Sequence, residues 1–124
     1  MTTRFLTLEH LLDLCRDLGV GPVRDVGQLD ACAQRPQTTL MGVDAYPAVE
    51  QKAAALLHSV VANHPLGDGN KRLGWHSLTV FLAINGLDVA LTHDEAFELT
   101  MAVADGSLRD VDAIAARLRT EPRL

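Results

Sequence analysis

Apolar residues recur every three or four positions along most of the chain, which is the spacing of one face of an α-helix. The first such stripe predicts a helix over about 8–18, which Thr7 can cap and Gly19 can end. A second, shorter stripe predicts a helix over about 25–34 that stops before Pro36. Further stripes predict helices over about 48–63, 70–85, 93–104 and 110–119.

The intervals between these stripes carry turn residues. Residues 36–47 lie between two prolines and contain Gly42, so they predict an ordered loop or a small hairpin. The predicted helix over 70–85 is apolar over much of its surface, which places it at the centre of the fold. No strand-rich section is evident, and we expect the tail after the last helix, residues 120–124, to be frayed. The pattern predicts an all-α bundle of about six helices.

Length and composition agree with one compact domain over residues 1–124. The chain has 124 residues, 48% of them hydrophobic, which is enough to bury a substantial core but leaves no room for a second domain. A net charge of −5 argues against direct nucleic-acid binding, which needs a basic face. No secretory signal or bilayer-spanning run is evident, so we expect a cytoplasmic protein without membrane association. Cys15 and Cys32 lie among apolar residues, which favours buried thiols over a disulfide.

One segment departs from the helical pattern, because residues 64–72 read His-Pro-Leu-Gly-Asp-Gly-Asn-Lys-Arg. Gly67 and Gly69 allow the backbone to turn so that successive N–H groups converge on an anion. The helix that begins at Asn70 would direct its positive end to the same place. Each residue alone is also typical of a helix-entry turn, but the whole string favours a phosphate-binding loop.

The side chains of this segment add the groups that phosphate chemistry requires. Lys71 and Arg72 carry full positive charges, although cations in the first turn oppose the helix dipole unless an anion neutralises them. Asp68 is a natural ligand for a magnesium ion bound to phosphates. His64 can take a proton from an incoming hydroxyl group. The segment therefore predicts a phosphate-transfer site.

The string resembles the signature of the Fic/Doc superfamily, His-x-Phe-x-Asp/Glu-Gly/Ala-Asn-Gly/Lys-Arg. The Doc toxin branch is the nearer match, because Lys71 stands where adenylyl-transferring Fic enzymes carry glycine and Trp75 where they carry a second arginine. Leu66 replaces the usual Phe, a change of about 1 kcal/mol that we expect to loosen the loop without loss of chemistry. Doc-like features outside the motif are Arg35-Pro36-Gln37, Lys52-Ala53-Ala54 and Phe81-Leu82-Ala83-Ile84-Asn85-Gly86.

The resemblance implies a Fic/Doc-like helical fold and a toxin of a toxin–antitoxin pair. Such a toxin transfers the γ-phosphoryl group of ATP to a Ser/Thr hydroxyl of a translation protein, by resemblance elongation factor Tu, and so inhibits translation. In that scheme His64 removes the hydroxyl proton and Asp68 holds Mg²⁺. Asn70, Lys71 and Arg72 then bind the phosphates together with the glycine turns and the helix N-terminus. The loop over 36–47 would flank the target segment and pair with it edge to edge, as the flap of the superfamily does.

Two alternatives remain open from the residues alone. A Fic-type nucleotidyl transferase would attack the α-phosphate and leave AMP on the target, although Lys71 and the missing second arginine count against it. A catalytically silent binding module would keep the fold and contact a partner, although intact His64 and Asp68 count against that. The resemblance also implies a Phd-like antitoxin. None of the five glutamates fits the inhibitory helix of Fic enzymes, so we expect inhibition in trans by an antitoxin segment that folds on binding.

Other chemically active side chains are interpreted as structural. Trp75 could stack on a base, but in an apolar helix it is more often part of the core. The remaining histidines share no short metal-ligand spacing and predict surface or core positions; they are His10, His58, His76 and His93. His76 should face away from the phosphate end of its helix.

Overall fold

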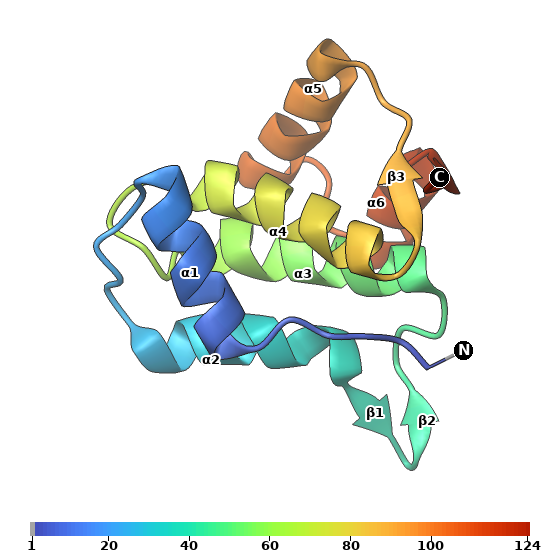
Figure 1. The fold of residues 1–124 in the computed structure, drawn as a ribbon, viewed down its shortest axis with the longest axis horizontal. Coiled ribbons are helices and arrows are strands. Elements are labelled where there is room, and N and C mark those ends of the chain that lie inside the picture. Colours follow the sequence, from blue (N-terminus) through green and yellow to red (C-terminus); the bar gives the residue numbers. More distant parts are fainter. Residues whose placement is uncertain (1) are drawn as a thin grey trace.

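The computed structural model describes residues 2–124, where six α-helices account for most of the chain (Figure 1). The helices are α1 (Leu8–Leu18), α2 (Val26–Gln34), α3 (Val49–Asn63), α4 (Asn70–Ile84), α5 (His93–Ala104) and α6 (Val111–Arg117). The shorter elements are the 3₁₀ helix η1 (Arg35–Gln37) and the strands β1 (Thr39–Leu40), β2 (Val43–Asp44), β3 (Leu87–Val89) and β4 (Thr120–Pro122). The predicted all-α bundle is confirmed, and each helix agrees with its predicted range to within two residues at either end.

The helix ends follow from local side-chain chemistry. At α1 the Thr7 hydroxyl accepts a hydrogen bond from the His10 N–H, while the Thr7 N–H donates to His10 Nδ1. Gly19 ends this helix in the left-handed conformation, with φ of 67°. Thr92 and Glu95 form the same kind of reciprocal cap at the start of α5. His10 therefore serves the fold as a capping residue.

The core forms around the central pair of helices α3 and α4. α1 and α5 pack against α4, and α6 packs against α3 (Figure 1). A Cβ atom added at Gly74 would lie 2.7 Å from Cγ2 of Val61, so the close approach of α3 and α4 requires glycine there. Fully buried side chains come from all six α-helices and the 64–69 loop: Leu11, Leu29, Leu56, Leu57, Val60, Leu66, Leu73, Leu78, Phe81, Leu82, Leu99 and Ile114.

Both cysteines contribute to this core as free thiols. Cys15 and Cys32 are buried, and burial raises the pKa of each thiol above its usual value. The prediction of buried thiols is confirmed. Over residues 2–124, no helix combines the length and the hydropathy that crossing a membrane requires.

The C-terminal tail is ordered, so the prediction that it is frayed was wrong. β4 pairs antiparallel with β3, with Asp88 opposite Glu121. The Arg123 guanidinium donates to Oδ1 of Asp88 at 2.9 Å. Just before β4, Arg119 donates to both carboxylate oxygens of Glu95, at 2.6 and 2.7 Å, and lowers the pKa of Glu95 to about 2. Strand pairing between segments more than 30 residues apart gives no periodic signal in either three-residue strand.

Residues 36–47 contain the small hairpin that was one of the two predicted outcomes. β1 and β2 pair antiparallel around Met41 and Gly42, which have φ of 51° and 80°. Lys52 of α3 is buried and its ammonium donates to Oδ2 of Asp44, at 3.2 Å, and to the carbonyl oxygen of Tyr46. These bonds tie the base of the hairpin to the start of α3.

A second polar cluster supports the same region. Arg35 donates from Nε to the Tyr46 hydroxyl at 3.2 Å, and its NH1 lies 2.7 Å from Nδ1 of His58. Burial, and then the neighbouring guanidinium, lowers the pKa of His58, so the ring is held in its neutral, acceptor form. His58 thus has a structural role at the hairpin base.

The hairpin lies apart from the loop over residues 64–69. The hairpin precedes α3, while residues 64–69 follow it, and Figure 1 shows the two at opposite ends of that helix. A helix of 15 residues is about 22 Å long. The hairpin therefore does not flank this loop, and a target segment touching both would have to span the length of α3.

Candidate active site

Backbone hydrogen bonds join the segment 64–69 to the connection between α1 and α2. Leu66 forms an antiparallel bridge with Val23. Backbone hydrogen bonds extend the contact on both sides of this bridge: Gly21 N–H to Asp68 O at 3.1 Å, Gly67 N–H to Pro22 O at 2.8 Å and Arg24 N–H to Pro65 O at 2.8 Å. This contact could not be predicted from the sequence, because residues 21–24 carry no motif and each is more than 40 positions from the loop residue that it contacts. These hydrogen bonds hold the loop backbone in one conformation and thereby fix the positions from which its side chains extend.

Leu66 and Asn70 stabilise the loop, Leu66 by burial and Asn70 by hydrogen bonds to the loop backbone. The Leu66 side chain is fully buried in the core. The Asn70 amide accepts the Leu66 N–H at Oδ1, at 2.9 Å, and donates from Nδ2 to the Leu66 carbonyl at 3.0 Å. Asn70 was predicted to bind phosphate, but its side chain is committed to the loop backbone. Only its main-chain N–H, in the first turn of α4, remains for an anion.

The two glycines of the loop have different roles. Gly69 has φ of 91°, and a Cβ there would lie 2.4 Å from Cβ of Val20. Gly67 has no positive φ, and its N–H is used by Pro22, so the prediction that both glycine turns present N–H groups to an anion was wrong for Gly67. Gly67 is favoured at this position because it has no side chain, since a Cβ would lie 3.3 Å from Cδ of Pro22.

Gly69→Ala is expected to destabilise the protein more than Gly86→Ala does. Gly86 has a similar φ of 81° but nothing within 4 Å of an added Cβ, so its substitution reports backbone strain alone, about 1–2 kcal/mol. At Gly69 the clash with Val20 adds about 1–3 kcal/mol of overpacking. Urea unfolding of both variants measures the difference in free energy of unfolding. Equal losses would show that Val20 moves aside without cost.

His64 is placed at the end of α3 in an unusual backbone conformation. It has φ of 50° and ψ of 58°, and its N–H donates to the Val60 carbonyl at 3.3 Å. Histidine is one of the few residue types enriched in this left-handed region, and such strain concentrates at functional sites. The side chain is exposed at the rim of the loop, where it can meet a substrate.

A single hollow of about 280 Å³ brings all the predicted site residues together. We call it the loop pocket; it is lined by His64, Gly67, Asp68, Gly69, Asn70, Lys71, Arg72 and Ala104. Ala104 is the last residue of α5, which the sequence did not associate with the site. Seven residues that are neighbours in sequence thus share one cavity with an eighth from a distant helix.

The charge of the loop pocket favours an anion. No side chain caps the start of α4, and the N–H groups of a first helical turn lack intrahelical acceptors. Lys71 and Arg72 are both exposed in the same turn. The positive end of the helix dipole repels both cations, and an anion bound at the start of α4 offsets this repulsion.

The loop pocket also fits a magnesium ion carried by a nucleotide. Asp68 is exposed and supplies one carboxylate, while its backbone carbonyl is used by Gly21. Within residues 2–124 there is no group of three or more metal-ligating side chains that could form a metal site made by the protein alone. Mg²⁺ commonly binds through one or two carboxylates together with substrate phosphates and water, and this donor set suits that mode.

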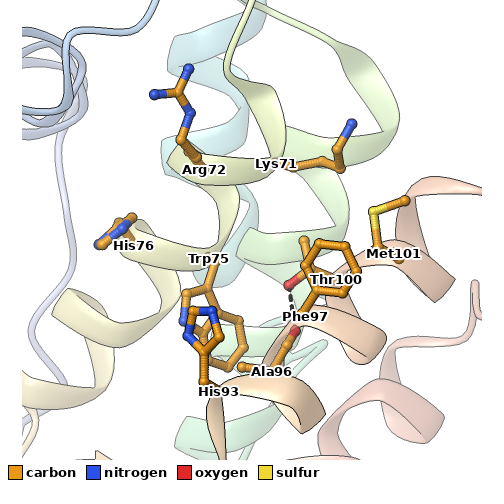
Figure 2. Close-up of a pocket in the computed structure, with 9 residues that line it drawn as sticks. All are labelled: Lys71, Arg72, Trp75, His76, His93, Ala96, Phe97, Thr100 and Met101. Carbon is orange, nitrogen blue, oxygen red and sulfur yellow. Dashed lines mark hydrogen bonds between the residues drawn. The ribbon is translucent and has the colours of Figure 1, made fainter.

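A second hollow, of about 380 Å³, lies between α4 and α5 (Figure 2). We call it the α4–α5 pocket; it is lined by Lys71, Arg72, Trp75, His76, His93, Ala96, Phe97, Thr100 and Met101. Trp75, interpreted as a core residue, is half-buried in its wall. His76, expected to face away from the phosphate end, lines the same pocket as Lys71 and Arg72. Trp75 packs against the core, as predicted, and His76 does not line the loop pocket. Their shared place in the α4–α5 pocket arises because α5 packs beside α4, which the sequence of α4 does not reveal.

The sequence of the loop falls within a match to a known protein family. The Fic/DOC family model matches residues 5–82, which is more than half of the chain and includes the whole loop. The chain belongs to the Fic/DOC family. A relative named toxin Doc, from Mycolicibacterium smegmatis (strain ATCC 700084 / mc(2)155), is 51% identical over 98 residues, which cover 77% of this chain and 75% of the relative. The match to the family model ends within α4, so the α5 wall of the α4–α5 pocket lies beyond it.

Proposed function

We propose that this Fic/DOC protein is the toxin of a toxin–antitoxin pair that transfers the γ-phosphoryl group of ATP to a Ser/Thr hydroxyl of a translation protein. Elongation factor Tu is the candidate target, and the transfer would inhibit translation in the cytoplasm. The observation that carries the proposal is the loop pocket, which His64, the candidate base, and the carboxylate of Asp68 line together with two cations and a helix N-terminus. The 51% identical relative that is named toxin Doc supports the toxin role.

In the proposed reaction His64 takes the proton of the target hydroxyl. The hydroxyl oxygen forms a bond to the γ-phosphorus while the bond from that phosphorus to the β–γ bridging oxygen breaks, so ADP leaves. Lys71, Arg72 and the first turn of α4 offset the negative charge. Mg²⁺, when bound with the nucleotide, supplies further charge neutralisation, and Asp68 would hold it. The fastened loop keeps these groups aligned, which is most of what phosphoryl transfer requires.

Adenylyl transfer is the second candidate for the same site. It places the α-phosphate beside the hydroxyl and releases pyrophosphate. Lys71 and Trp75, which stand at positions where adenylyl-transferring relatives carry glycine and arginine, favour phosphoryl transfer. The strained backbone of His64 at the rim of the loop pocket counts against a catalytically silent binding module, because such strain is typical of residues that take part in chemistry.

Labelling separates the candidates. The purified protein is incubated with a translation extract and ATP radiolabelled at either the γ- or the α-phosphate, and the modified protein is identified by mass spectrometry. Label from the γ-position alone, on elongation factor Tu, is the expected result. Label from the α-position would establish adenylyl transfer. With neither label incorporated by a correctly folded protein, the enzymatic proposal fails.

Inhibition in trans is part of the proposal. The glutamate pattern of a self-inhibiting Fic helix is absent from the sequence, so restraint would come from a Phd-like antitoxin whose disordered segment folds against this protein. Expression of the chain without an antitoxin should arrest growth, and Asp68→Asn, which removes the metal-binding charge, should not. Harmless expression of a folded, catalytically active protein contradicts the toxin role.

A further inference from the structure

We propose that the α4–α5 pocket is a docking site for the protein target of the transfer reaction, and that it receives an apolar side chain from a target segment that also carries acidic residues. The inference rests on the proposed function, because it names the feature by which that target is recognised. The α4–α5 pocket shares Lys71 and Arg72 with the loop pocket. A protein whose hydroxyl group reaches His64 is therefore adjacent to the α4–α5 pocket as well.

One stripe of α5 forms a wall of the α4–α5 pocket. Its members recur every three or four residues, which places them on one face of the helix: His93, Ala96, Phe97, Thr100 and Met101. Phe97 is 62% exposed and Met101 is 37% exposed, and Figure 2 shows both opposite the side chains of α4. Neither belongs to the buried core or to the partly buried side chains packed against it. The fold therefore leaves an aromatic and a flexible apolar side chain open to a second molecule.

The exposure of this wall fits the surface of another protein. Aromatic residues and methionine are enriched at protein interfaces, where a single aromatic anchor can supply much of the binding energy. A small ligand is instead mostly enclosed by its pocket, and a side chain as exposed as Phe97 encloses little. The match to the family model ends at residue 82, so Phe97 and Met101 lie outside the segment matched to the family as a whole. A surface in that position suits the recognition of one particular target.

Charge decides which kind of target segment fits. Lys71 and Arg72 border the α4–α5 pocket together with His76 and His93, and none of the residues that line it is acidic. The whole chain has a net charge of −5, so this positive border is a local feature. Such a border attracts an acidic segment and repels a basic one. The occupant is therefore an apolar side chain flanked by Asp or Glu.

The extent of the surface fits a contact that forms and breaks in each turnover. The α4–α5 pocket has a volume of about 380 Å³ and presents two exposed apolar side chains. A stable protein interface buries about 800 Å² on each partner, and one pocket of this size provides only part of that. An enzyme must release its modified target, so a small docking site suits the target better than it suits a tightly bound inhibitor.

The test measures the kinetics of phosphoryl transfer to purified elongation factor Tu, the candidate target. Phe97→Ala should raise the KM for the target about tenfold and leave kcat and the KM for ATP unchanged, because the truncated side chain contacts the target alone. Met101→Ala, on the same wall, should act in the same direction. The control is Val26→Ala, which truncates a side chain of similar exposure, 54%, on α2 and should change none of the three constants. Thermal melting checks that each variant is folded.

Two further variants test the charge of the target segment. Phe97→Lys should show a lower KM for the target than Phe97→Glu does, because an acidic segment is attracted by the first and repelled by the second. Equal KM values for these two variants, or a lower value for Phe97→Glu, would overturn the acidic flank.

Each alternative occupant gives a different result. An unchanged KM for the target in folded Phe97→Ala and Met101→Ala overturns the inference but leaves the proposed function standing. A KM raised for ATP alone would assign the α4–α5 pocket to the nucleotide. Weaker inhibition by the antitoxin, with both KM values unchanged, would assign it to the antitoxin, and either result also overturns the inference. If wild type phosphorylates no protein target, both the inference and the proposed function fail.

Discussion

His64→Ala is expected to lower the rate of phosphoryl transfer by about two to four orders of magnitude, the range usual for a group that acts as acid or base. ATP affinity should survive, because Lys71, Arg72 and the start of α4 remain in place. Single-turnover rates and nucleotide titrations measure the two effects separately. Parallel losses of rate and ATP affinity, together with a lower melting temperature, would show that the histidine is structural.

The backbone of His64 supplies an internal control. With φ of 50°, the position favours glycine, so His64→Gly should be about 1–2 kcal/mol more stable than His64→Ala while being equally inactive. A higher stability of the glycine variant than of the alanine variant would measure the backbone strain that any residue with a Cβ carries at this position. If the two variants unfold at the same urea concentration, the left-handed conformation is not maintained in solution.

Lys71→Gly is expected to cost phosphoryl transfer at least about 2 kcal/mol of transition-state stabilisation, about thirtyfold in rate, if the ammonium makes a charge-assisted contact with the phosphates. Lys71 lines the loop pocket, so its loss removes positive charge from the proposed phosphate site. The space left by the side chain also allows the nucleotide to bind in the opposite orientation. We therefore expect a weak adenylyl-transfer activity, limited by Trp75 in place of arginine.

Intact-mass analysis of the target, after incubation with wild type and with the variant, measures both effects. Lys71→Ala is the matched control, because it removes the same charge but avoids the cost of glycine in a helix, about 1 kcal/mol. Both variants should lose phosphorylation to a similar extent. An adenylyl adduct from wild type would overturn the kinase assignment, and full phosphorylation by either variant would remove Lys71 from the mechanism.

The local elements of this protein could be predicted from its sequence. Helix stripes and caps involve residues three or four positions apart, so α1 and α5 were placed by Thr7, Gly19 and Thr92 without knowledge of the rest of the fold. The run from His64 to Arg72 likewise identified the family, because its residues are contiguous in the chain.

Tertiary structure alone decided how that run is used. The Gly67 N–H is satisfied by Pro22, more than 40 residues away, and the Asn70 amide holds the Leu66 backbone, so neither is available in the way the motif suggests. The short strands β3 and β4 exist only as each other's partner. Phe97 is exposed in the same pocket as Lys71 because of how α5 packs against α4. A periodic pattern in one helix contains no information about which face its neighbour will leave exposed.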